Sequence, residues 1–173
     1  SGRTSQGNSD DVNPVGSDFA YHNDVFGIGR DDNSADLHRR ISKSNNTDSI
    51  VTVALDNDFV SGNDSVNRTT DVAADKQWLM IGNDNGSRYF DTGFTSTNTN
   101  LRVGKTWKVR SAGGFNQNVS MQFGAKHPGA IDLKPGTTYY LIQDNDGDFS
   151  TGAVELASAV ATVDSDYVGE VTF

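Results

Sequence analysis

The chain of 173 residues contains no cysteine, only three prolines and no long apolar run. Without cysteine it can form no disulfide bond, thiol nucleophile or zinc–thiolate centre. A membrane-spanning helix needs roughly 18 or more apolar residues in a row, so we expect no membrane insertion. The first residues also lack the charged and apolar regions of a signal peptide. We therefore expect Ser1 to mark the edge of a domain within a longer chain.

Catalytic motifs are also missing. The three histidines, at positions 22, 38 and 127, have no metal-ligand spacing, and no G-x-S-x-G segment marks a nucleophile. We predict that the chain is not an enzyme. Its formal net charge of −9 would repel phosphate groups over most of the surface, so we expect no nucleic-acid partner.

Glutamate is nearly absent, whereas aspartate and asparagine are abundant. All 23 acidic residues are aspartate except Glu155 and Glu170. The densest acidic segment is Gln143-Asp-Asn-Asp-Gly-Asp-Phe149, in which Asp144, Asp146 and Asp148 surround one glycine. Three carboxylates this close repel one another unless a cation lies between them, and calcium prefers oxygen ligands on such flexible loops. The sequence therefore predicts a calcium site in this segment.

Similar short acidic segments recur along the chain, so we expect several Ca²⁺ ions. The candidate ligands outside the 144–148 segment are Asp31, Asp32, Asn83 and Asp84, with Asp56, Asp58 and Asp64 as less secure additions. A second interpretation is that these residues only form turns, because aspartate and asparagine side chains readily bond to their own backbone. For each of these pairs taken alone, both interpretations stay open.

Short alternating segments indicate an all-β fold. Segments rich in β-branched and aromatic residues are bounded by glycine, asparagine, aspartate or proline, and lie at 49–55, 77–82, 106–110, 119–123, 137–142 and 168–173. This spacing predicts a Greek-key-like antiparallel β-sandwich with long calcium-binding loops. Residues 1–18 are polar and are expected to form a linker or a loosely attached arm. Residues 19–173 would then form a single ligand-binding domain.

Three segments carry further expectations for the fold. Residues 35–42 show helical periodicity, whereas 152–160 fits a helix and a strand equally well. The segment Leu133-Lys-Pro-Gly-Thr-Thr-Tyr139 resembles the tyrosine corner of fibronectin-type sandwiches. We therefore predict that the Tyr139 hydroxyl bonds to nearby backbone and that the Asp144 loop lies at one end of the sandwich.

A glycine-rich segment, Phe26-Gly-Ile-Gly-Arg-Asp-Asp32, has two interpretations. Gly27 and Gly29 could form a bulge or tight turn, with Arg30 paired to an aspartate. Alternatively, the glycines let a ligand approach the backbone while Arg30 binds its carboxylate. Ser44 and Asn45, in a polar segment that follows, are candidates to contact the main chain of such a ligand or to form an exposed turn.

Four segments in order, Tyr21–Asp32, Ser42–Asn46, Leu79–Asp84 and Tyr140–Asp148, together resemble the peptide-binding domain of large bacterial RTX adhesins. The resemblance covers residues 20–173. It implies a calcium-loaded β-sandwich, monomeric when isolated, within a secreted adhesin at the bacterial cell surface. Its partners would be peptide or protein C-termini on host or partner cells. Carried over by position, the ligand-binding candidates are Gly27, Gly29, Arg30, Ser44 and Asn45, and the calcium candidates are Asp31, Asp32, Asn83, Asp84, Asp144, Asp146 and Asp148.

The resemblance leads to a functional hypothesis. An extended peptide would enter a cleft between segments 27–32 and 42–46, and its C-terminal carboxylate would meet a calcium ion or Arg30. Two alternatives stay open. A calcium-dependent carbohydrate-binding module would share the same acidic loops, and a structural extender domain would use calcium only for rigidity.

Overall fold

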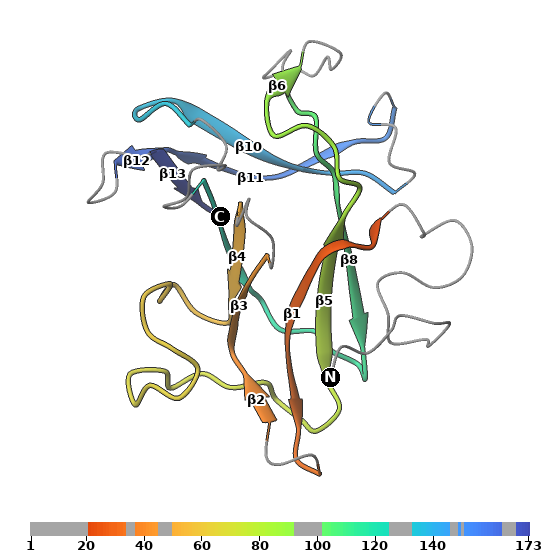
Figure 1. Cartoon of the computed structure of the whole chain (residues 1–173), viewed down its shortest axis with the longest axis vertical. Coiled ribbons are helices and arrows are strands. Elements are labelled where there is room, and N and C mark those ends of the chain that lie inside the picture. The colour runs from red at the N-terminus through yellow and green to blue at the C-terminus, as the bar shows by residue number, and fades with distance from the viewer. Residues whose placement is uncertain are drawn as a thin grey trace.

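The computed structural model describes residues 21–33, 37–44, 50–91, 102–124, 133–145, 149, 151–163 and 169–173. Among them, no helix is long and apolar enough to cross a membrane. The strands are β1 (Asn23–Asp31), β2 (Leu37–Arg39), β3 (Ile41–Lys43), β4 (Val51–Ala54), β5 (Trp78–Asn83), β6 (Phe90–Asp91), β7 (Arg102–Val103), β8 (Trp107–Ala112), β9 (Ser120–Phe123), β10 (Thr138–Gln143), β11 (Val154–Val160), β12 (Thr162–Val163) and β13 (Gly169–Thr172) (Figure 1). The linker predicted at 1–18 lies outside the described residues.

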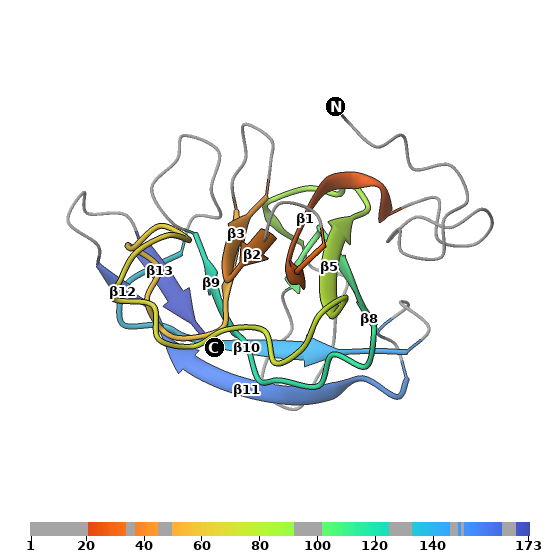
Figure 2. The same ribbon diagram turned by 90° about the horizontal axis from the view of Figure 1, so that it is seen from below.

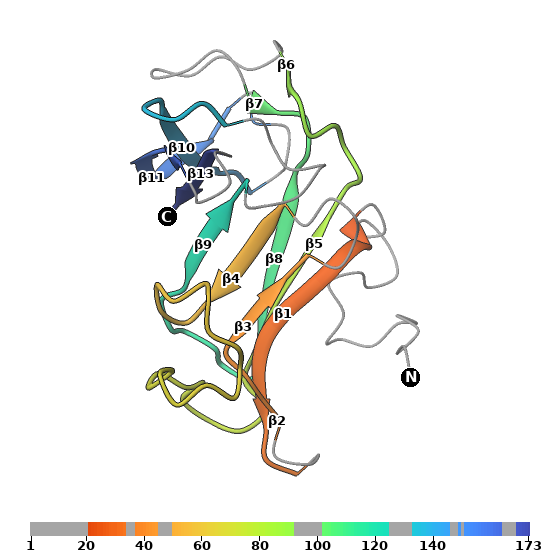
Figure 3. The same ribbon diagram turned by 60° about the vertical axis from the view of Figure 1, so that its left-hand side comes forward.

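Two antiparallel sheets form the body of the domain. One has the strand order β2-β1-β5-β8 and the other β12-β13-β9-β4-β3. β3 lies beside β1 (Figure 3), where the backbone N–H of Gly27 donates to Oγ of Ser42 at 3.3 Å. The all-β antiparallel sandwich predicted from the sequence is confirmed.

The hydrophobic core lies between these sheets. Alternate residues of a strand point to one face, and the buried apolar positions of the central strands follow this rule. Fully burying one such aliphatic side chain stabilises the fold by about 1.5–3 kcal/mol. The core residues on these strands are Phe26, Ile28, Val51, Val53, Leu79, Ile81, Phe123 and Val171.

All six predicted strand segments contain an observed strand. The helix expected at 35–42 is wrong, because its described residues form β2 and β3. β2 pairs with β1 and β3 pairs with β4, and this strand pairing overrides weak local periodicity. Residues 152–160 contain β11, so the strand interpretation of that segment is correct.

The β10–β11 hairpin forms a separate two-stranded sheet that crosses one end of the other strands (Figures 1 and 2). The predicted tyrosine corner anchors it. The backbone N–H of Lys134 donates to the Tyr139 hydroxyl at 2.9 Å. The Tyr139 ring packs against Phe90, with 5.8 Å between ring centroids. The hairpin therefore holds the Asp144 segment, which connects its two strands, at a fixed end of the domain.

Candidate functional site

The connection between β10 and β11 holds the strongest calcium candidate. In its described part, the backbone N–H of Phe149 donates to Oδ2 of Asp144 at 3.0 Å, which closes a loop over residues 144–149. Phe149 has a positive φ of 57°, so the chain turns sharply there. Asp146 and Asp148 lie outside the described residues. This hydrogen bond thus joins the two described ends of the predicted site.

Asp84 and Arg102 share Tyr21 as a neighbour. The Arg102 guanidinium stacks over the Phe149 ring at 5.2 Å from its centroid. Burial raises the pKa of Tyr21, the nearby Asp84 carboxylate raises it further, and Arg102 lowers it. Asp84 and Arg102 therefore both lie close to Tyr21, which links β5 to the 144–149 loop. Oδ1 of Asp84 accepts backbone N–H groups from Gly86 at 2.9 Å and Thr106 at 3.0 Å, as an aspartate that shapes a turn does.

Asn83 belongs to a different set of contacts. It is only 1% exposed, and its side-chain amide donates to Oδ2 of Asp24 at 2.7 Å. Its Oδ1 accepts the backbone N–H of Asn85 at 2.8 Å and Nζ of Lys105 at 3.4 Å. An ammonium at this position would repel a metal ion. We therefore leave Asn83 out of the cation-binding residues proposed below.

Asp31 and Asp32 lie at the opposite end of β1. Asn23, the first residue of β1, pairs with Asn83, whereas Asp31 is its last residue. At about 3.3 Å per residue, the two ends are roughly 25 Å apart. Asp31 and Asp32 therefore cannot share an ion with Asp84 or with the 144–149 loop.

Basic side chains already bind these two aspartates. Nε of Arg30 lies 2.6 Å from Oδ1 of Asp32, and its Nη2 lies 3.1 Å from Oδ2. The Arg30 guanidinium lowers the pKa of the Asp32 carboxyl. Lys76 contacts Asp31 through its ammonium. His38 lies between two carboxylates, with Nδ1 2.5 Å from Asp71 and Nε2 3.5 Å from Asp32. This end of the domain is a network of ion pairs.

The two glycines of the predicted peptide cleft lie against β5. A Cβ on Gly27 would lie 2.3 Å from the Leu79 carbonyl oxygen, and one on Gly29 would lie 2.0 Å from the Trp78 ring. Both glycines therefore permit close packing of β1 on β5, inside a strand rather than in a turn; the bulge of β1 lies earlier, between Asn23 and Phe26.

The remaining cleft residues are also engaged. The Nε and Nη2 atoms of Arg30 contact Asp32, and its Nη1 donates to the carbonyl oxygen of Val72 at 3.3 Å. Ser44 is buried, and its Oγ accepts the backbone N–H of Val51 at 3.5 Å. Asn45 lies outside the described residues. The segments around Gly27 and Ser44 do meet, as predicted, but they pack on each other.

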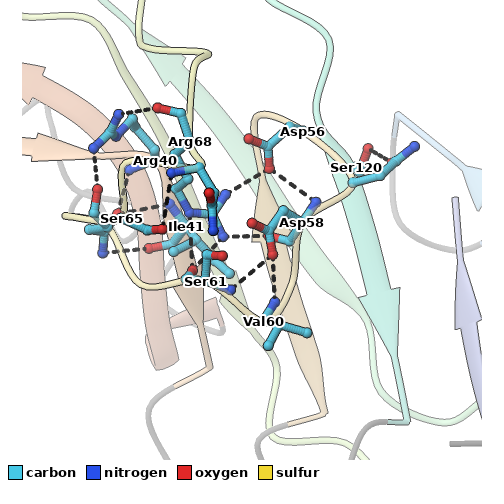
Figure 4. A network of polar contacts seen from close by, with 12 residues as sticks. Arg40, Ile41, Asp56, Asp58, Val60, Ser61, Ser65, Arg68 and Ser120 are labelled. Atoms are coloured by element: carbon cyan, nitrogen blue, oxygen red, sulfur yellow. Dashed lines mark hydrogen bonds and ion pairs between the residues drawn. The ribbon is translucent and has the colours of Figure 1, made fainter.

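Sequence reasoning missed the role of Arg68, which organises the loop after β4 (Figure 4). Its side chain is fully buried, and Nη1 lies 2.7 Å from Oδ1 of Asp56. The same guanidinium donates to the carbonyl oxygens of Ser61, Gly62 and Asp58. A cation from the chain itself thus lies within this acidic loop. No local signal could reveal it, because Arg68 is twelve residues beyond Asp56.

Sequence reasoning also missed an exposed apolar face on β11. Leu156 and Val160 are 56% and 55% exposed, and they lie on the same side of the strand. Val154, which is 58% exposed, lies beyond an irregularity in the pairing of β11 with β10 between Glu155 and Ala157. The opposite side packs on the core through Ala159, with Tyr139 and Leu141 of β10. The alternation of apolar residues on both faces was the available signal, since a half-buried strand normally has polar residues on its outer face.

Within the described ranges, no group of three or more His, Asp or Glu side chains could hold a metal ion. Two of the three carboxylates of the 144–148 segment lie outside those ranges.

The family model of the domain of unknown function DUF8202 matches residues 12–172. The chain belongs to this family. No curated protein and no solved structure matches the chain. The resemblance to RTX adhesins stays a prediction.

Proposed function

We propose that this DUF8202 domain is a calcium-dependent, non-catalytic recognition module of a bacterial surface adhesin, and that it binds an extended polypeptide segment outside the cell. The observation that carries the proposal is the exposed apolar face of the β10–β11 hairpin, whose connecting loop contains Asp144, Asp146 and Asp148. The candidate peptide surface and the candidate calcium site are thus parts of one hairpin.

The apolar face has the shape and spacing for an extended peptide. Leu156 and Val160 are four residues apart on the same side of β11, and Val154 is exposed beyond the bulge near Glu155. A contiguous exposed apolar patch commonly marks an interaction surface, because exposure to water stabilises nothing by itself. A bound peptide in β conformation would place alternate side chains against this row.

The edges of the hairpin support the same kind of ligand. In the part of the chain that the structure describes, β10 and β11 form ladder pairs only with each other. Backbone groups on an unpaired strand edge can form hydrogen bonds with an added strand. Main-chain bonds would supply part of the affinity, while Leu156 and its neighbours would select apolar peptide side chains.

Calcium would act by stiffening this hairpin. An isolated two-stranded hairpin is marginally stable in water, and a cation held by the 144–148 carboxylates would fix the connection between its strands. It would also remove the repulsion between those carboxylates. Peptide affinity would then depend on calcium even if the ion does not touch the peptide.

The test is isothermal titration of the domain with a library of extended apolar peptides, with calcium and then with EDTA. We expect binding with calcium and at least a tenfold loss with EDTA. Replacing Leu156 with glutamate should reduce affinity by tenfold or more, because it puts a charge in the centre of the apolar face. Val66→Glu is the matched control, because Val66 is 94% exposed and lies outside the hairpin.

Two outcomes would contradict the proposal: binding that survives EDTA, or equal affinity for Leu156→Glu and the control. Peptides with a free or an amidated C-terminus test separately whether a terminal carboxylate takes part. Calcium-dependent binding on a glycan array, with no peptide bound, would favour a carbohydrate-binding module instead.

A further inference from the structure

A buried polar cluster of Asp24, Asn83 and Lys105 lies where β1 begins and β5 ends. Asn83 is among the most deeply buried residues of the chain, and the side chains of Asp24 and Lys105 are 4% and 2% exposed. Asp24 has a positive φ of 52° and lies in the bulge of β1 between Asn23 and Phe26. Such a bulge redirects a side chain, here toward Asn83.

The three side chains contact one another. Nδ2 of Asn83 donates to Oδ2 of Asp24 at 2.7 Å. Nζ of Lys105 lies 3.4 Å from Oδ1 of Asn83 and 3.9 Å from Oδ2 of Asp24. An amine, a carboxamide and a carboxyl group are therefore held together within the protein interior.

As a purely structural ion pair, this cluster would be a poor design. The Lys105–Asp24 contact is long, and removing two charges from water is costly. Oδ1 of Asp24 is buried and has no hydrogen-bond partner, which adds a further desolvation cost. A buried, unsatisfied carboxylate oxygen beside an amine and an amide calls for an explanation other than stability.

We propose that Lys105 and Asn83 react with each other to form an intramolecular isopeptide bond, with Asp24 as the proton carrier. The Lys105 ammonium transfers a proton to Asp24, and the resulting neutral amine attacks Cγ of Asn83. A bond between Nζ and Cγ forms, and the bond between Cγ and Nδ2 breaks after that nitrogen receives a proton. Ammonia leaves and takes up the remaining proton in water as ammonium, which returns Asp24 to its carboxylate form. No electrons are exchanged with another molecule.

The packing favours this reaction. The side chains of Asp24, Asn83 and Lys105 are nearly completely buried, so water has little access to the reacting groups. Positioned reacting groups also avoid most of the entropy cost of a bimolecular step. The product is a neutral amide in place of the Lys105 ammonium and the Asn83 carboxamide.

The bond would join the end of β5 to the segment that precedes β8. It would close the chain between residues 83 and 105, which includes β6 and β7. This cross-link would hold the end of the sandwich that faces the β10–β11 hairpin. It does not depend on calcium or on the proposed peptide ligand.

The test is mass spectrometry of the purified full chain. We expect the intact mass to fall below the sequence mass by one ammonia. Trypsin should leave Lys105 uncut and release fragments 77–88 and 103–108 as one branched peptide, whose fragmentation locates the bond between Asn83 and Lys105. Lys105→Arg and Asp24→Asn should both retain the full sequence mass and give only linear fragments.

The control is Lys108→Arg, which changes a lysine whose ammonium lies over the Tyr21 ring and should leave the ammonia loss complete. Asn85-Gly86 could also lose ammonia by forming a succinimide, but that product gives a linear peptide and survives Lys105→Arg. A wild-type chain with its full sequence mass, or an ammonia loss without the branched peptide, would overturn the proposal. If Asp24→Asn fails to fold, the presence or absence of the branched peptide in the wild-type chain still tests the proposal.

Discussion

The loop after β4 and the loop after β10 share the sequence Asp-Asn-Asp, at 56–58 and 144–146, but their surroundings differ. In the first loop, the buried Arg68 guanidinium contacts Asp56 and the surrounding carbonyl oxygens. In the second, the nearby Arg102 guanidinium stacks on Phe149, and a third carboxylate follows at Asp148. The same triplet can therefore close on an arginine or form part of a predicted calcium site. An Asp-Asn-Asp triplet alone does not identify a calcium loop.

The largest expected effect is that of removing Arg68. Arg68→Ala would leave Asp56 and the carbonyl oxygens of Asp58, Ser61 and Gly62 without this donor. Breaking a buried charge pair in this way costs about 3–5 kcal/mol, which we expect in the free energy of unfolding measured by urea denaturation. Calcium should not restore the lost stability, because the cavity left by the guanidinium differs from a calcium site in its shape and in its set of ligands.

The matched control for that experiment is Arg88→Ala. Arg88 stacks its guanidinium on the neighbouring Tyr89 ring at 5.2 Å, and such a contact is worth at most about 1 kcal/mol when it is exposed. Equal losses in the two variants would show that Arg68 does not organise its loop. A recovery of Arg68→Ala on adding calcium would mean that the two loops are interchangeable.

The sequence predicts most of the strands, because they depend on local alternation and on turn residues. It also predicts the Tyr139 corner, whose bond spans only five residues. The sequence does not predict the partners of most of the acidic residues. Arg30 and Asp32 are close in sequence, but Asp31 meets Lys76 and His38 meets Asp71 only after the chain folds. The ion-pair network is a consequence of the topology.

Buried polar residues are the hardest to predict. Aspartate and lysine usually lie at the surface. The burial of Asp24 and Lys105 depends on the bulge in β1 and on the end of β5. The glycines of β1 were open to two interpretations for a similar reason. Only the partner strand shows that Leu79 and Trp78 occupy the space beside Gly27 and Gly29.

The second prediction concerns calcium and the loop after β10. At a free concentration of 100 times its dissociation constant, calcium should raise the free energy of unfolding by about 2.7 kcal/mol. Asp146→Asn should remove most of this gain, because it deletes one carboxylate from the predicted site. Asp56→Asn should lower stability through Arg68 and leave the calcium gain intact. An undiminished gain in Asp146→Asn, measured by thermal denaturation, would place the ion elsewhere.

The smallest expected effect concerns Asp58 in the loop after β4. Its dependence on pH extends the comparison of the two loops. Hydrogen bonds lower the pKa of Asp58 from 3.8 to about 2; the Ser61 hydroxyl contributes most, followed by the backbone N–H groups of Ser61 and Val60, and the charge of Arg68 contributes least. Because the pKa is lower in the folded chain, these bonds stabilise the fold above the unfolded pKa. Their contribution is lost as the pH falls toward about 2.

Ser61→Ala tests this order of causes. Removing the hydroxyl should raise the pKa of Asp58, yet keep it below its ordinary value, because the backbone donors at 2.9 Å remain. The measurement is an NMR titration of the Asp58 carboxyl carbon, with Ser65→Ala as control, since the Ser65 hydroxyl instead accepts the backbone N–H of Asn67. If Ser61→Ala leaves the pKa unchanged while Arg68→Gln, which removes the charge, raises it, the arginine charge dominates. The loop after β4 would then resemble a cation site in its electrostatics as well as in its shape.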